Sequence, residues 1–171
     1  MQFTDRSIGL LISGVLCLLL AAFVYWQYRK RRIARALAWT SFNVAGYCWL
    51  TAGLSAATTE HTALLWLRIF MPFAYFLGVA FFRFSMLYSR SENRWTSGYL
   101  KFADVMVVIL SLIKVLNLSN GAKYVEGLGW FPANDPVYAY VYAPFLSLTL
   151  LGSLGMVITK IVKSRPGLER N

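Results

Sequence analysis

Four ionisable side chains lie inside otherwise apolar stretches of the sequence. They are Arg68, Arg83, Asp104 and Lys114. A charge at membrane depth is costly, so each such residue indicates a role and a partner. Arg83 and Asp104 fall near facing ends of two successive apolar runs, and antiparallel helices would bring them within reach of each other. We predict an intramembrane ion pair that acts as a structural clamp, with a relay or switch as the alternative; Arg68 and Lys114 are close enough to the outer surface to extend towards it.

A second candidate site is the aromatic stretch around Pro72. This proline removes a backbone hydrogen bond and is expected to kink its helix. Rings on both sides of the kink, with a tryptophan from a later loop, could enclose an apolar ligand or a partner helix. The candidate pocket consists of Trp66, Arg68, Phe70, Pro72, Phe73, Tyr75 and Trp130. The alternative is an aromatic band that faces lipid.

Catalytic and metal chemistry find little support among the residues. The one histidine, His61, stands beside Glu60 without a second histidine. Cys17 and Cys48 lie in apolar runs and lack the spacing of metal ligands. A single intramembrane carboxylate is too few for a paired acid–base mechanism, and phosphate-binding or nucleophile motifs are lacking. We therefore expect no enzyme activity, no metal and no cofactor.

The elements that carry these residues are predicted to be membrane-spanning helices. Of the 171 residues, 58% are apolar and 14% are charged, against roughly 25% charged in a soluble domain. Five apolar runs follow one another, and a hydrocarbon core of ~30 Å is crossed by about 20 helical residues. The runs cover about 8–27, 33–57, 63–88, 102–117 and 138–162, with an outer loop at 118–137. Because lipid leaves open strand edges unsatisfied, we expect an all-α polytopic bundle that forms one domain over residues 1–171.

The distribution of Lys and Arg predicts the orientation of this bundle. Twelve of these residues lie in the first and third connections and near the C-terminus: Arg29, Lys30, Arg31, Arg32, Arg35, Arg90, Arg94, Lys101, Lys160, Lys163, Arg165 and Arg170. The opposite side has only Arg6 and Lys123. The positive-inside rule then places the N-terminus outside and the C-terminus in the cytoplasm. Basic clusters between apolar runs do not form the single basic face that nucleic acid requires.

The outer loop is rich in turn residues such as Asn120-Gly121, Gly127 and Pro132. Apolar residues flank these turns, so the loop is expected to form either a small hairpin over the bundle or an amphipathic connector on the headgroups. The glycosylation pattern Asn117-Leu118-Ser119 is interpreted as a chance occurrence.

Several segments resemble a known family. A basic stretch from Arg29 to Arg35 leads into a run with Trp39 and Trp49, and a Leu-Trp-Leu-Arg…Pro…Phe pattern follows between Leu65 and Phe84. The loop sequence Gly127-Leu128-Gly129-Trp130 and the exit Arg165-Pro166-Gly167-Leu168-Glu169-Arg170 add to the pattern. Together they resemble the seven-transmembrane N-terminal sensor region of bacterial histidine kinases, which is also found ahead of diguanylate cyclases. The resemblance implies a sensor that passes a helix shift to a cytoplasmic output domain.

The family has two further spans and an effector, so we expect this sequence to be either a fragment of a longer sensor or a five-span relative with no output domain of its own. Two hypotheses follow. The first is a non-catalytic sensory input module of a bacterial two-component signalling protein in the cytoplasmic (inner) membrane. The second is an accessory or structural subunit of a larger membrane complex, packed on partner helices, lipids or pigments. The expected partners are the lipid bilayer and either other membrane helices or a cytoplasmic output domain.

Overall fold

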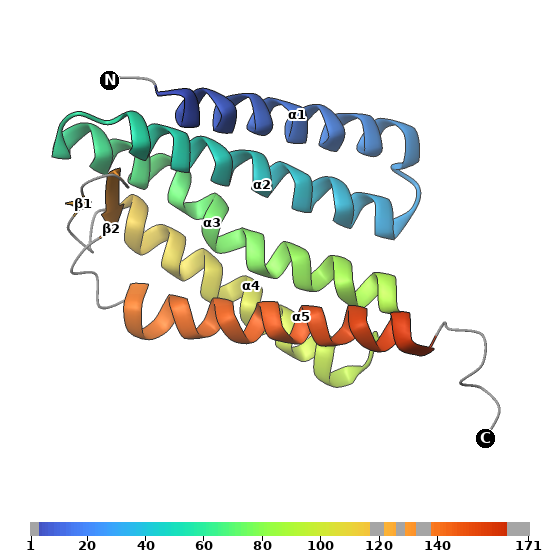
Figure 1. Ribbon diagram of the computed structural model, residues 1–171. Coiled ribbons are helices and arrows are strands. Elements are labelled where there is room, and N and C mark those ends of the chain that lie inside the picture. Colours follow the sequence, from blue (N-terminus) through green and yellow to red (C-terminus); the bar gives the residue numbers. More distant parts are fainter. Residues whose placement is uncertain (1–3, 117–121, 126–128, 133–137, 164–171) are drawn as a thin grey trace.

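The structure is a bundle of long helices with a small β-hairpin at one end (Figure 1). The computed structural model describes residues 4–116, 122–125, 129–132 and 138–163. Its elements are α1 (Asp5–Tyr28), α2 (Arg32–Ala56), α3 (Glu60–Ser89), α4 (Arg94–Val115), β1 (Ala122–Val125), β2 (Gly129–Pro132), the π-helical turn η1 (Tyr138–Tyr142) and α5 (Ala143–Lys163). The predicted all-α class is confirmed. Two segments named in the sequence analysis lie outside the described residues: the glycosylation pattern at 117–119 and the segment 165–170 that resembles the sensor family.

Side-chain caps determine where two of the helices begin. Thr4 and Ser7 form a reciprocal capping box at the start of α1, and Asn93 and Thr96 form one at the start of α4. Each box satisfies backbone N–H groups that have no partner within the helix. Because of its cap, α4 begins at Arg94, well before the fourth apolar run. Hydropathy alone misses these polar first turns.

α3 is the central helix of the bundle. α2, α4 and α5 all pack directly on α3, whereas α1 packs on α2 (Figure 1). The main apolar core follows α3 and takes side chains from its neighbours. It consists of Leu50, Leu67, Met71, Ala74, Tyr75, Val79, Ala103, Val107, Leu110 and Tyr142. α3 therefore lies at the junction of several helices.

Apolar side chains also cover much of the outside of the bundle. Leu16, Phe23 and Leu151 are 60%, 62% and 65% exposed, as expected of helices that face hydrocarbon chains instead of water. Within the described residues, three helical stretches are long and apolar enough to cross a membrane, with mean hydropathies of 2.6 (α1), 1.8 (α3) and 1.9 (Ala139–Val162). α2 and α4 have 25 and 22 residues, or ~37 Å and ~33 Å of helix, but they are more polar. Their passage through the membrane stays a prediction.

Candidate functional site

Arg83 and Asp104 meet between α3 and α4. Arg83 Nη2 donates a hydrogen bond to Asp104 Oδ2 over 2.6 Å. The two side chains are 37% and 40% exposed, so they form a half-buried ion pair. The short α3–α4 connection makes the helices antiparallel neighbours, which places the end of α3 beside the start of α4. The two charges that the sequence paired are thus in contact, and a charge-assisted bond of this length is strong.

This ion pair lines a cavity of about 480 Å³ at one end of the bundle. The cavity lies among the start of α2, the end of α3 and the start of α4, next to the α3–α4 connection. Its charged lining residues are Arg32, Arg35, Arg83, Lys101, Glu92 and Asp104, and its apolar ones include Trp39, Met86 and Leu100. Four cations against two carboxylates give the cavity an excess of positive charge. Its composition suits an anionic group attached to an apolar body.

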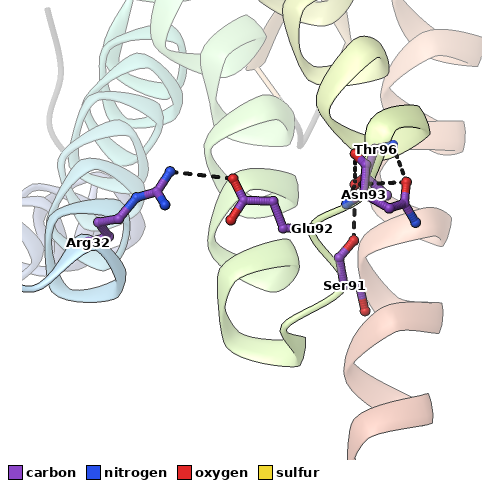
Figure 2. A network of polar contacts seen from close by, with 5 residues as sticks. All are labelled: Arg32, Ser91, Glu92, Asn93 and Thr96. Atoms are coloured by element: carbon purple, nitrogen blue, oxygen red, sulfur yellow. Dashed lines mark hydrogen bonds and ion pairs between the residues drawn. The ribbon is translucent and has the colours of Figure 1, made fainter.

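A second ion pair, between Arg32 and Glu92, also lines this cavity. Arg32 Nη2 on α2 lies 3.4 Å from Glu92 Oε1 in the α3–α4 connection (Figure 2). Figure 2 also shows Ser91, Asn93 and Thr96 joined by hydrogen bonds that hold this connection in place. Both members of the Arg32–Glu92 pair are well exposed, and exposed pairs contribute little to stability. The connection is therefore ordered mainly by its own caps.

The cavity is a site that the sequence analysis missed, although a signal was present. Arg32, Arg35 and Trp39 recur at positions i, i+3 and i+7 of one helix, which places them on one face. In the sequence, Arg32 and Arg35 indicated only the orientation of the bundle, as two of the twelve basic residues on one side. Lys101 belongs to a different helix, and its position opposite that face depends on how α4 is rotated about its axis.

The rings predicted around Pro72 form a packed cluster against α2. Trp66 stacks on Phe70 at a centroid distance of 5.0 Å, and Phe70 lies 5.9 Å from Phe73. Trp66 lies on Gly53 and Phe73 lies on Gly46, so closely that a Cβ atom at either glycine would overlap the ring. The rings occupy the space that the missing side chains leave on α2. A ligand at this position would have to displace them.

The other members of the candidate pocket lie in different surroundings. Tyr75 is 2% exposed and contacts Tyr142 of η1 at a centroid distance of 4.4 Å. Arg68 is exposed on the outside of α3. Trp130 belongs to the hairpin, and its Nε1 donates a hydrogen bond to the carbonyl of Ala57, the C-cap of α2, over 3.1 Å. The residues of the candidate pocket are thus divided among the ring cluster against α2, the Tyr75–Tyr142 contact, the outside of α3 and the hairpin.

The hairpin alternative for the outer loop is confirmed. β1 and β2 pair antiparallel, with Tyr124 opposite Trp130 and Lys123 opposite Phe131. The Tyr124 and Trp130 rings meet edge to face at 5.6 Å, an arrangement that aromatic pairs favour. The bond from Trp130 to the end of α2 attaches the hairpin to the α2–α3 turn. The turn residues 126–128 and the other loop residues, 117–121 and 133–137, lie outside the described residues.

α5 is joined to its neighbours by polar contacts as well as by packing. The hydroxyl groups of Tyr99 on α4 and Thr149 on α5 lie 2.7 Å apart. The hydroxyl of Tyr142, at the entry to α5, donates to the carbonyl of Ala74 on α3 over 2.7 Å. Such hydrogen bonds contribute to helix association in lipid. α5 is therefore linked by hydrogen bonds to both α3 and α4.

The remaining candidate residues lie apart from these contacts. Lys114 is only 4% exposed, so it lies within the protein and does not extend to the outer surface as the sequence suggested. Cys17 and Cys48 are free, half-buried cysteines. Within the part of the chain that the structure describes, no group of three or more His, Cys, Asp or Glu could hold a metal ion.

The chain matches a known protein family. The family model described as the N-terminal 7TM region of histidine kinase matches residues 9–171. No curated protein and no solved structure matches the chain. Because the matched region covers nearly the whole chain and the structure is an apolar helical bundle, this protein belongs to the family of N-terminal 7TM regions of histidine kinases.

Proposed function

We propose that the chain is a non-catalytic sensory input module of a bacterial signalling protein. In this proposal α1 to α5 all cross the cytoplasmic membrane, with the N-terminus outside and the end of α5 in the cytoplasm. The observation that carries it is the family match over residues 9–171, because regions of this family supply the membrane part of histidine kinases. The match favours a sensor over an accessory subunit of a membrane complex.

The positions of the basic residues in the structure support this orientation. The start of α2, the end of α3, the start of α4 and the end of α5 lie at the same end of the bundle (Figure 1). Arg32, Arg35, Arg90, Arg94 and Lys160 all belong to these segments. Lys123 lies in the hairpin at the opposite end. By the positive-inside rule, the first end is cytoplasmic and the hairpin end is external.

The contacts of α5 supply a route for a signal. In the proposed orientation α5 runs towards the cytoplasmic side, and it is held by Thr149 to α4 and by Tyr142 to α3. A signal that alters the spacing of α3 and α4 would move α5 through these contacts. In this mechanism the Arg83–Asp104 pair acts as a clamp that sets the resting distance between α3 and α4.

Cysteine labelling tests the orientation. In a Cys17→Ala, Cys48→Ala background, Lys30→Cys and Thr58→Cys place single thiols in two turns at opposite ends of the bundle. We expect a membrane-impermeant maleimide to label Thr58→Cys in intact cells and Lys30→Cys only after lysis. The reverse labelling would contradict the proposed orientation.

Purification from native membranes tests the function. We expect the chain to be part of, or to associate with, a polypeptide that carries a histidine kinase or cyclase domain. Stoichiometric co-purification with a large membrane complex that lacks such domains would contradict the sensor proposal and support the accessory subunit.

A further inference from the structure

The charged cavity adjoins a second hollow that lies on the lipid-facing side of α1 and α2. This groove measures about 350 Å³ and is almost entirely apolar. Its lining residues are Leu18, Ala21, Ala22, Tyr25, Arg35, Ala38, Trp39 and Phe42. Arg35 and Trp39 belong to both hollows. A cationic cavity and an apolar groove thus meet at two shared side chains.

The lengths of the two hollows match those of a phospholipid in the inner leaflet. Arg32 lies at the start of α2, and Phe42 lies ten residues further along the same helix, or ~15 Å along its axis. This distance is about half of a hydrocarbon core of ~30 Å. A headgroup beside Arg32 and Arg35 would therefore have its acyl chain alongside Ala38, Trp39 and Phe42.

The charges of the cavity favour an anionic headgroup. Arg32 and Arg83 are already paired with Glu92 and Asp104. Arg35 and Lys101, by contrast, have no ion-pair partner in the described part of the chain. Both face the same cavity from different helices, Arg35 from α2 and Lys101 from α4. Two unpaired cations across one hollow suit a phosphate oxygen that accepts from both.

We propose that this combined site binds one anionic phospholipid, with its phosphate between Arg35 and Lys101 and an acyl chain in the α1–α2 groove. The proposal rests on the membrane orientation proposed above. A bound lipid would connect α1, α2 and α4 at the cytoplasmic end, beside the Arg83–Asp104 clamp. The state of the inner leaflet would thereby act on the α3–α4 spacing that the sensor uses.

The headgroup half of the proposal is tested with the purified chain in detergent. Native mass spectrometry would count lipids retained during titration with phosphatidylglycerol or with phosphatidylcholine of the same acyl chains. We expect preferential retention of phosphatidylglycerol. We expect the double variant Arg35→Gln, Lys101→Gln to weaken it about 30-fold, since each cation near the surface contributes about a 5-fold change in affinity.

A matched control separates the site from general attraction of basic protein for anionic lipid. Lys30→Gln with Arg94→Gln also removes one lysine and one arginine at the same end of the bundle, and neither residue lines the cavity or the groove. We expect this double variant to change the affinity less than about 2-fold. Equal losses in the two double variants, or equal retention of the two lipids, would overturn the proposal.

The acyl-chain half is tested by filling the groove. Ala22→Phe places a ring in the groove from α1, whereas Leu20→Phe places one on the opposite, exposed face of the same helix. We expect Ala22→Phe to lower phosphatidylglycerol retention at least 5-fold and Leu20→Phe to leave it unchanged. Millimolar inorganic phosphate that displaces the lipid completely, or an unchanged affinity in Ala22→Phe, would indicate a free-phosphate site and overturn the lipid assignment. These assays need neither an output domain nor a particular orientation, so they fail independently of the proposed function.

Discussion

The two ends of the α2–α3 pair are built differently. From the middle of the helices to the hairpin end, Phe73 and Trp66 of α3 lie directly on Gly46 and Gly53 of α2. At the basic end, the start of α2 and the end of α3 line a cavity of about 480 Å³ whose walls carry charges. Apolar packing without gaps resists displacement, whereas a charged cavity can change its contacts at low cost. We therefore expect the hairpin end to be the fixed end of the bundle and the basic end to be its adjustable end.

The largest expected effect comes from the fixed end. Gly53→Ala would force Trp66 away from α2, and overpacking of this kind costs about 2 kcal/mol. Gly155→Ala on α5 is the control, because its new methyl group meets nothing within 4 Å. This control should leave stability unchanged or raise it by up to about 1 kcal/mol through helix propensity. Unfolding in detergent measures both free energies, and equal stability of the two variants would remove the distinction between the ends.

The Arg83–Asp104 clamp should give the next largest effect. Asp104→Asn leaves Arg83 without its anion, and we expect a loss of about 1–2 kcal/mol, between the values for exposed and for buried pairs. Unfolding of the single variant and of the double variant Arg83→Gln, Asp104→Asn measures the coupling between the two residues. If they form a functional pair, the two variants lose the same stability. Additive losses would mean that the charges act independently.

The smallest effect is expected at the mouth of the cavity. Glu92→Gln removes the exposed Arg32–Glu92 pair and should cost less than about 0.5 kcal/mol. The same substitution removes a negative charge from the cavity. We therefore expect it to strengthen the retention of phosphatidylglycerol about 2-fold. A stability loss as large as that of Gly53→Ala would show that the basic end is as firmly held as the hairpin end.

Local features of this fold could be predicted from the sequence to a useful degree. The Arg83–Asp104 contact could be predicted because the two side chains have opposite charges and lie at similar depth. The short connection between α3 and α4 makes these helices antiparallel neighbours, so few other partners are within reach. The turn residues between Tyr124 and Trp130 predicted a hairpin as one of two alternatives, because turn residues have strong local preferences, but they left an amphipathic connector open. The start of α4 could also have been found, since Asn93 and Thr96 form a recognisable capping box.

Features that depend on the rotation of helices about their axes could not be predicted. The sequence contains Trp66 and Gly53, but not the register that brings the ring onto the glycine. The cavity likewise requires Arg35 and Lys101 to face each other across two interfaces. The sequence indicates how deep Lys114 lies along its helix, and this depth suggested that it reaches the outer surface. The sequence does not indicate the helix face on which Lys114 lies, and that face is buried.

The central position of α3 has a consequence for biosynthesis. Each helix after the first packs on one that precedes it: α2 on α1, α3 on α2, and both α4 and α5 on α3. A chain inserted from its N-terminus therefore offers every emerging helix a surface that is already in the bilayer. The bond from Trp130 to Ala57 spans a long stretch of sequence and forms only after α4 is in place. We therefore expect the helices to assemble in the order in which they are synthesised, with the Trp130–Ala57 bond forming late.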